Sequence, residues 1–427
     1  MNELEQRIGI EQVRIGLFIR MESWMDHPFL FSSFKIRTEK QLQVLRSLGI
    51  SHVLYDPEKS DQEPLPLPRV ETPVPPRQPQ PVDPEVEAMW AAKQERREKL
   101  MAQREALGRC EMKFFTGVST VKSLLRNLFS RPEASIQQAH ELVADLVGSM
   151  LEDKDVVLHL MNAKAGDEGG YYHAVNITML ALILGREAKL NPDEMRALGL
   201  GTLLHDIGKE KVPSQILLKK SPWTTAERNF YQQHVLYGIE MAKQLPGIPA
   251  AALEVIAQHH ELLDGSGYPA RLKGEQIGRC ARIASIVNAF DNYCNGGNLA
   301  DAMTPAEAVS FMFKKESGKY DPGLMQLFVR CMGVYPPGSV VQLSNAQIGL
   351  VMSVNPGRLL HPSLLIYDPE VPKEEALWLD LSETPGLSVV RTLRPSELDK
   401  AVLDYLNPRA RVSYYADGNR SSSRAHA

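Results

Sequence analysis

The chain has 427 residues, which is enough for about two to four domains, and its 43% hydrophobic and 23% charged residues are ordinary for a globular protein. The net charge of -4 excludes strong bulk attraction to a nucleic acid polymer or an anionic membrane. The four cysteines form no Cys-x-x-Cys pair, which favours free thiols in a reducing compartment. The chain has no signal-peptide pattern and no apolar run near the ~18 residues of a membrane span. We therefore expect a cytoplasmic protein without a transmembrane segment.

Residues 1–60 predict a small α+β domain, which we interpret as regulatory. Polar and apolar residues alternate at the start of the segment from Gln12 to Arg20, as in a half-buried strand. Apolar residues take helical spacing from Thr38 to Leu48, and the segment from Ser51 to Tyr55 is typical of a closing strand.

A linker and a helical connector follow. Residues 61–84 contain nine prolines, a density that favours a semi-extended linker over a packed element. Residues 85–150 are predicted to form the connector, because charged, helix-favouring residues run to Arg109 and helical patterns continue to about Leu160. The charged part is either a solvated helix or a dimerisation helix, so a homodimer is one alternative.

Residues 151–320 are predicted to form a helical domain. The run from Val175 to Leu184 is largely apolar, which is typical of a helix in the middle of a bundle. Thr224 and Glu227 have capping-box spacing at the start of another helix. A further helix from Ala251 to Gln258 leads directly into a pair of histidines.

The C-terminal part has a different character. Residues 321–416 are predicted to be an extension that is β-rich after residue 335, and residues 417–427 a disordered tail. Turn residues separate three strand-like runs, at 339–343, 349–354 and 363–367. The predicted fold class is therefore mainly α, a helical bundle with a small α+β N-terminal domain and a β-rich C-terminal extension.

Five of the eleven histidines lie between His173 and His260 inclusive, and they indicate a metal site. Imidazoles and carboxylates are the ligands that borderline divalent metals prefer. The groups fall on different predicted helices, and helical bundles build metal sites from inward side chains of facing helices. One histidine alone is more often structural, but adjacent buried imidazoles without a metal would be costly to desolvate. The candidate ligands are His173, His205, Asp206, His234, His259 and His260.

The neighbouring residues suggest roles in phosphoryl chemistry. Asp206 has two oxygens and is suited to bridge two metals, which together steady the attacking and leaving oxygens of a displacement. Lys209 lies about one helical turn further on and can neutralise a phosphate oxygen if the helix continues. Gly265, Gly267 and Pro269 form a sharp loop that can approach a ligand closely.

These motifs resemble the HD-GYP family of bacterial phosphodiesterases. The resemblance covers roughly residues 150–320 and rests on two segments, His205-Asp206-Ile207-Gly208-Lys209 and His259-His260-Glu261 followed by Asp264-Gly265-Ser266-Gly267-Tyr268-Pro269. The N-terminal segment, with Gly16-Leu17-Phe18 and Pro28-Phe29-Leu30, resembles the small domain of unknown function that often precedes this one.

The resemblance implies an HD-type bundle that hydrolyses cyclic di-GMP to linear pGpG, GMP or both in cytoplasmic second-messenger signalling. It also implies an iron or manganese centre and signalling proteins as partners. By motif, the six candidate ligands map onto metal ligands and Lys209 onto the phosphate-facing lysine. Gly265, Gly267 and Tyr268 map onto the substrate side of the site.

Three departures from the family pattern bear on activity. Asn288 occupies the position of the last metal-binding aspartate, and a neutral amide binds such cations more weakly than a carboxylate; Asp291 is expected to be structural. The segment from Asn295 to Leu299 lacks the family's Arg-Pro-Tyr clamp. Gly169 stands where a third-metal glutamate occurs, which favours two metals.

Two other functions remain open at this point. The departures at Asn288 and at the clamp favour a weakly active or inactive member that binds the nucleotide or partner proteins as an adaptor. A phosphohydrolase for other nucleotides, including mixed cyclic dinucleotides, is a further alternative, because the residues that read the substrate cannot be picked out.

Overall fold

The computed structural model describes most of the chain, in two compact units. Unit 1 comprises residues 1–104 with 368–376, and unit 2 comprises residues 105–367 with 377–427. Most of the predicted proline-rich linker and the end of the predicted tail lie outside the described residues. The described residues are 5–21, 27–29, 33–66, 84–152, 156–161, 169–219, 221–296, 302–354, 358–369, 371, 373, 376–384, 386–406 and 412–418.

Unit 1 has the predicted α+β character. Its antiparallel sheet has the order β1-β4-β2-β3, and α1 (Glu39–Ser47) begins after Thr38, whose hydroxyl accepts a hydrogen bond from the backbone N–H of Gln41. The predicted start of the first strand is wrong, because residues 10–12 form a 3-10 turn and the chain turns again at Gly16 (φ +96°). The strands are β1 (Gln6–Gly9), β2 (Phe18–Arg20), β3 (Ser33–Lys35) and β4 (His52–Asp56).

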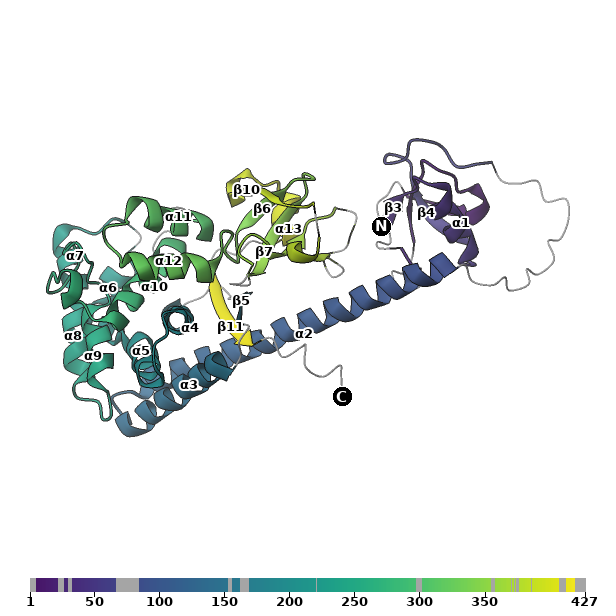
Figure 1. The fold of residues 1–427 in the computed structure, drawn as a ribbon. Coiled ribbons are helices and arrows are strands. Elements are labelled where there is room, and N and C mark those ends of the chain that lie inside the picture. The colour runs from purple at the N-terminus through teal and green to yellow at the C-terminus, as the bar shows by residue number, and fades with distance from the viewer. Residues whose placement is uncertain are drawn as a thin grey trace. The chain divides into compact units, whose positions relative to one another are not determined.

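Two long helices make up the predicted helical connector. They are α2 (Pro84–Asn127), one uninterrupted helix of 44 residues, and α3 (Pro132–Glu152) (Figure 1). From residue 105 onward this region belongs to unit 2. Phe114, Val118 and Val121 form one buried stripe of α2, and Val143 of α3 joins the same core. The second half of the predicted connector is therefore part of the helical core.

The bundle of unit 2 is built around α4 (Gly169–Glu187). Every residue from Ala174 to Gly185 is buried, which confirms the helix predicted in the middle of the bundle. Thr224 caps α7 with Glu227 in the predicted capping box. Of the later helices, α5, α10 and α12 pack directly on α4. The helices that follow α4 are α5 (Pro192–Leu204), α6 (Ser214–Leu217), α7 (Thr225–Gln232), α8 (His234–Ala242), α9 (Ala250–Gln258), α10 (Arg279–Asn295), α11 (Pro305–Lys315) and α12 (Pro322–Met332).

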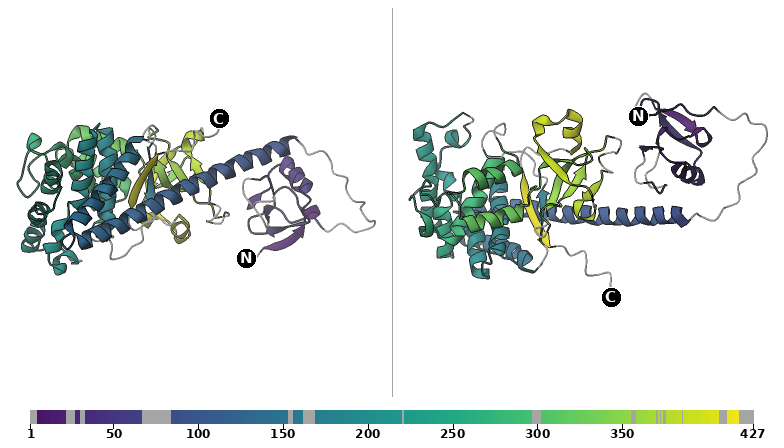
Figure 2. Two further views of the ribbon diagram at one scale, coloured as in Figure 1. Left: turned by 90° about the horizontal axis from the view of Figure 1, so that it is seen from below. Right: turned by 45° about the horizontal axis from the view of Figure 1, so that its top comes forward.

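The C-terminal extension supplies six strands of a seven-stranded antiparallel sheet, as its strand-like runs predicted, and β5 supplies the seventh. Its main path is β10-β6-β7-β5-β11; β8 pairs with β7, β9 pairs with β8, and α13 (Lys400–Leu406) precedes β11. Figure 2 shows the sheet at one end of the bundle and the teal helices α5 to α9 at the other. The strands are β5 (Val156–Met161), β6 (Val340–Leu343), β7 (Ile348–Val354), β8 (Ser363–Ile366), β9 (Trp378–Asp380), β10 (Val389–Leu393) and β11 (Ser413–Gly418).

Two predictions about this sheet are wrong. The helical pattern expected to reach about Leu160 gives way to β5, because pairing with β7 and β11 outweighs the local preference. Asp417 and Gly418, expected to begin the disordered tail, pair with Val157 and Val156 at the end of β11.

None of the helices in the described ranges is both long enough and apolar enough to cross a membrane.

The burial of Tyr414 predicts that β11 stabilises unit 2. Its side chain is fully buried, and its hydroxyl donates to the Pro337 carbonyl at 3.1 Å. We expect Tyr414→Ala to lower the free energy of unfolding by about 3–5 kcal/mol, and Tyr414→Phe by about 1–2 kcal/mol because only the hydrogen bond is lost. Val390→Ala, at an exposed position of β10, should change it by less than about 0.5 kcal/mol. Denaturant unfolding measures all three, and equal losses for Tyr414→Ala and Val390→Ala would contradict the prediction.

Candidate metal centre

The ends of four helices bring the six candidate ligands together. His173 lies in the second turn of α4, His205 and His259 follow the last residues of α5 and α9, and His234 begins α8. Helix α7, which carries Phe230, ends at Gln232, and His234 starts a new helix. Ligand atoms lie within 4.8 Å of one another in two groups, which share Asp206: Asp206 with His234, His259 and His260, and Asp206 with His173 and His205.

The two oxygens of Asp206 face different histidines. Oδ2 lies 3.2 Å from Nε2 of His205 and 3.5 Å from Nε2 of His173. Oδ1 lies 3.4 Å from Nε2 of His234 and 4.0 Å from Nε2 of His259. The carboxylate therefore stands between the two groups, as a bridging ligand would.

Backbone carbonyls set the orientation of three rings. Nδ1 of His205, His234 and His259 lies 2.6, 2.7 and 2.9 Å from the carbonyl oxygen three residues earlier. Nδ1–H is then the donor in each ring, and the Nε2 lone pair is directed inward. His173 is held in the same sense by Asp291, whose Oδ2 lies 2.5 Å from its Nδ1. This is the arrangement in which outer partners fix a metal-binding imidazole.

Three buried atoms at the centre have no hydrogen-bond partner among the described residues. They are Oδ1 of Asp206 and Nε2 of His234 and His259. Burial of an unpaired polar atom costs on the order of 1–3 kcal/mol. A divalent cation would satisfy all three at once, and nitrogen and carboxylate donors are the ligands that such cations take. The residues present therefore fit a divalent metal.

Electrostatics keep the ligands in their binding forms. Burial lowers the pKa of His259 and His260 well below the usual value, so both rings are neutral at neutral pH. Burial alone would raise the pKa of Asp206, but the Lys209 ammonium and the neighbouring His205 ring outweigh burial and hold the pKa of Asp206 well below its usual value. Burial would lower the pKa of Lys209, but the Asp206 carboxylate outweighs burial and raises it.

Lys209 reaches the centre by a different backbone path from the predicted one. Helix α5 ends at Leu204, and a 3-10 helix, η2 (Ile207–Lys211), continues the chain. Nζ of Lys209 nevertheless donates to Oδ2 of Asp206 at 2.5 Å and lies 5.5 Å from the centre of the Tyr231 ring. Lys209 thus stands beside the cluster on the side of α7.

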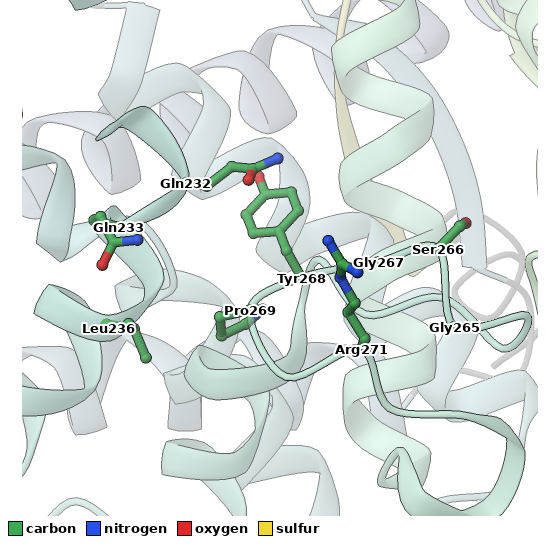
Figure 3. A pocket seen from close by; sticks show the side chains of 9 residues that line it. All are labelled: Gln232, Gln233, Leu236, Gly265, Ser266, Gly267, Tyr268, Pro269 and Arg271. Carbon is green, nitrogen blue, oxygen red and sulfur yellow. The ribbon is translucent and has the colours of Figure 1, made fainter. Parts of the chain in front are cut away.

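A closely packed loop lies next to His260. A Cβ atom on Gly267 would come within 2.5 Å of the His260 carbonyl oxygen, so only glycine allows this approach. The Tyr268 ring stacks on the His260 ring with 4.5 Å between centroids and 21° between planes. The predicted substrate-side residues Gly265, Gly267 and Tyr268 line a cavity of about 340 Å³ beside the cluster (Figure 3).

Asp291 is the residue whose importance the sequence interpretation missed. It was expected to be structural, yet Oδ2 holds His173 while Oδ1 accepts from Nδ2 of Asn176 and of Asn295. Asn176 gave the one available signal, because it is a buried amide inside the largely apolar stretch of α4.

The three departures from the family pattern have different places in the structure. Asn288 is buried on α10, one turn before Asp291, and its Oδ1 accepts a hydrogen bond from Asn292 at 3.1 Å. Gly169 is the first residue of α4. Of the segment without a clamp, residues 297–299 lie outside the described residues.

Comparison with known proteins agrees with the fold. Residues 141–324 match the HD domain, and residues 5–139 match the domain of unknown function DUF3391. The chain is 30% identical over 367 residues to the cyclic di-GMP phosphodiesterase PA4108 of Pseudomonas aeruginosa, with 85% of each chain covered.

Two further relatives are similar over shorter stretches. Identity is 29% over 215 residues to the cyclic di-GMP phosphodiesterase response regulator RpfG of Xanthomonas campestris, covering 49% of this chain and 57% of the relative. It is 29% over 178 residues to the 3'3'-cGAMP-specific phosphodiesterase 2 of Vibrio cholerae, covering 41% and 34%. The chain belongs to the HD-domain phosphodiesterase family of the HD-GYP type, with a DUF3391 domain at its N-terminus.

Close packing at Gly208 predicts that metal binding by the cluster requires glycine at this position. A Cβ atom there would lie 1.9 Å from the His234 carbonyl oxygen, so Gly208→Ala must push η2 away from α8. We expect the divalent-metal content of the purified protein to fall sharply. Gly148→Ala in α3 is the control, because nothing lies within 4 Å of its Cβ and alanine favours the helix by about 0.5–1 kcal/mol. Metal analysis of both variants checks the prediction, which fails if their contents are equal.

Proposed function

We propose that this protein hydrolyses cyclic di-GMP to linear pGpG, GMP or both, as a divalent-metal-dependent enzyme of bacterial second-messenger signalling. The observation that carries the proposal is the pair of donor groups that share the Asp206 carboxylate. Two relatives named as cyclic di-GMP phosphodiesterases support the choice of substrate, one of them similar over 85% of its length.

The proposed cofactor is a pair of divalent ions, iron or manganese. His234, His259 and His260 would hold one ion, His173 and His205 the other, with Asp206 shared between them. A donor set that mixes imidazoles with a carboxylate suits these metals. When bound, two such ions activate water and stabilise the attacking and leaving oxygens of a phosphoryl displacement.

The other residues of the site would bind and orient the substrate. The ammonium group of Lys209 stands beside Asp206 and is placed to neutralise a phosphate oxygen as negative charge develops. Asp291 is a positioning residue, because it holds the ring of His173. Gly265, Gly267 and Tyr268 line the cavity into which the rest of the substrate would extend.

A second candidate function is that of an adaptor that binds the nucleotide or a signalling protein without turnover. The observation in its favour is Asn288, which supplies a neutral amide whose oxygen already accepts a hydrogen bond from Asn292. The ion near His173 and His205 would then have the shared Asp206 as its one charged ligand and would have one imidazole fewer than its neighbour. Hydrolysis of a mixed cyclic dinucleotide is the remaining alternative, since one relative is named as a 3'3'-cGAMP-specific enzyme.

The proposal predicts loss of both metal and turnover when the shared carboxylate is removed. We expect the wild type, purified anaerobically, to contain about two iron or manganese ions per chain and to convert cyclic di-GMP to linear dinucleotide or GMP. His205→Ala with Asp206→Ala should lose bound metal and turnover while circular dichroism stays unchanged. Metal analysis and product chromatography test this. Unchanged turnover in the double variant would reject the centre, and metal without turnover in the wild type would favour the adaptor.

Asn288 gives a second test of the same proposal. Asn288→Asp should tighten binding of the second ion and raise turnover at limiting metal, because it adds a charged ligand near Asp291. Asn229→Asp adds the same charge at an exposed position of α7, outside both donor groups, and is the control. Metal titration of the two variants and the wild type is the measurement. Identical titration curves for all three would show that Asn288 lies away from the ions.

A further inference from the structure

The cavity beside the candidate centre has polar side chains with no role so far. Its walls include Gln232 at the end of α7, Gln233 just before α8, and Tyr268 and Arg271 of the loop (Figure 3). The cavity adjoins the metal cluster, because Tyr268 stacks on His260 and Gln233 directly precedes His234. A molecule whose phosphate lies at the cluster would therefore extend into this space.

Arg271 adopts a left-handed backbone conformation, which its surroundings must stabilise. Its φ is +56°, in the left-handed region, which costs a residue with a side chain roughly 1–2 kcal/mol. The Glu261 carboxylate enforces it by accepting the N–H groups of Ala270, Arg271 and Leu272 at 2.6, 3.1 and 2.9 Å. None of the described residues forms a hydrogen bond or ion pair with the Arg271 guanidinium. The loop therefore presents an unpaired cation at the cavity.

We propose that Arg271, Gln232 and Gln233 form a subsite that reads a guanine base of a cyclic dinucleotide; this rests on the proposed function and specifies its substrate. Guanine offers two acceptors, O6 and N7, to an arginine, and its N1–H and N2–H groups are donors to amide oxygens. The two amides that line the same cavity provide both donors and acceptors, as a base edge requires, whereas a phosphate requires only donors. An adenine would direct its N6 donors at Arg271, so the subsite discriminates against it.

Arg271→Gly removes the guanidinium and leaves the backbone as it is. Glycine adopts the left-handed conformation readily and keeps the N–H that donates to Glu261. We expect its unfolding temperature to be no lower than that of the wild type. Its KM for cyclic di-GMP should rise about 5- to 150-fold, the loss of one bidentate base contact. Metal content and hydrolysis of bis(p-nitrophenyl) phosphate, which has no base, should not change. Arg228→Ala, which removes the same charge from an exposed position of α7, should leave KM unchanged.

Three results would overturn the subsite: an unchanged KM for Arg271→Gly, an equal rise in KM for cyclic di-AMP, or full rescue by Arg271→Lys, which keeps the charge but not the bidentate geometry. If the wild type hydrolyses none of these substrates, the proposed function fails separately. Calorimetric binding of cyclic di-GMP and cyclic di-AMP then tests the subsite alone. A guanine preference that Arg271→Gly abolishes supports it, and equal affinities of wild type and variant overturn it.

Discussion

The Asp206 carboxylate is the constraint on which the candidate centre depends. Its two oxygens face different sets of histidines, so the site is one cluster with a shared member. The rings of His205, His234 and His259 are held inward, because their Nδ1 atoms face backbone carbonyls. Burial of Oδ1 of Asp206 and of Nε2 of His234 and His259 without hydrogen-bond partners destabilises this part of the fold. Any cation that the cluster binds therefore also stabilises the junction of α5, α8 and α9.

The sheet supports the cluster through a chain of hydrogen bonds. The backbone N–H of Tyr414 in β11 donates to Oδ1 of Asn176, and Nδ2 of Asn176 donates to Asp291, which holds His173. These bonds cross from a C-terminal strand to α4 and α10. In β5, which precedes the bundle in sequence, Leu158 and His159 pair with both β7 and β11. The C-terminal extension is thus part of the structure that orients a candidate ligand.

Local patterns were sufficient for most of the fold and for the composition of the cluster. The cap at Thr224 and the buried run of α4 follow from residues close together in sequence, and the pairs His205-Asp206 and His259-His260 are contiguous. Strand β5 could not be predicted in this way, because its partners lie far along the chain. The role of Asp291 likewise depends on a contact with His173, 118 positions away.

For Lys209 the predicted contact with Asp206 is present, although the predicted continuation of the α-helix is wrong. A continuing α-helix was the condition for Lys209 to face Asp206, and α5 instead ends at Leu204. The 3-10 helix that follows has about three residues per turn, so side chains at i and i+3 still align. Lys209 is three residues after Asp206 and contacts it. The left-handed conformation of Arg271, by contrast, has no signal in local spacing, because it depends on the position of Glu261.

Glu261 joins the histidine pair to the cavity. It directly follows His260, yet it lies in neither donor group, because both of its oxygens accept backbone N–H groups of the loop at residues 270–272. The same loop returns to His260 through the Tyr268 N–H and the stacked Tyr268 ring. Hydrogen bonds and ring stacking therefore join the cluster to this wall of the cavity. An arrangement held in this way would orient a bound phosphate and its attached group together, which lowers the entropic cost of reaching a reactive geometry.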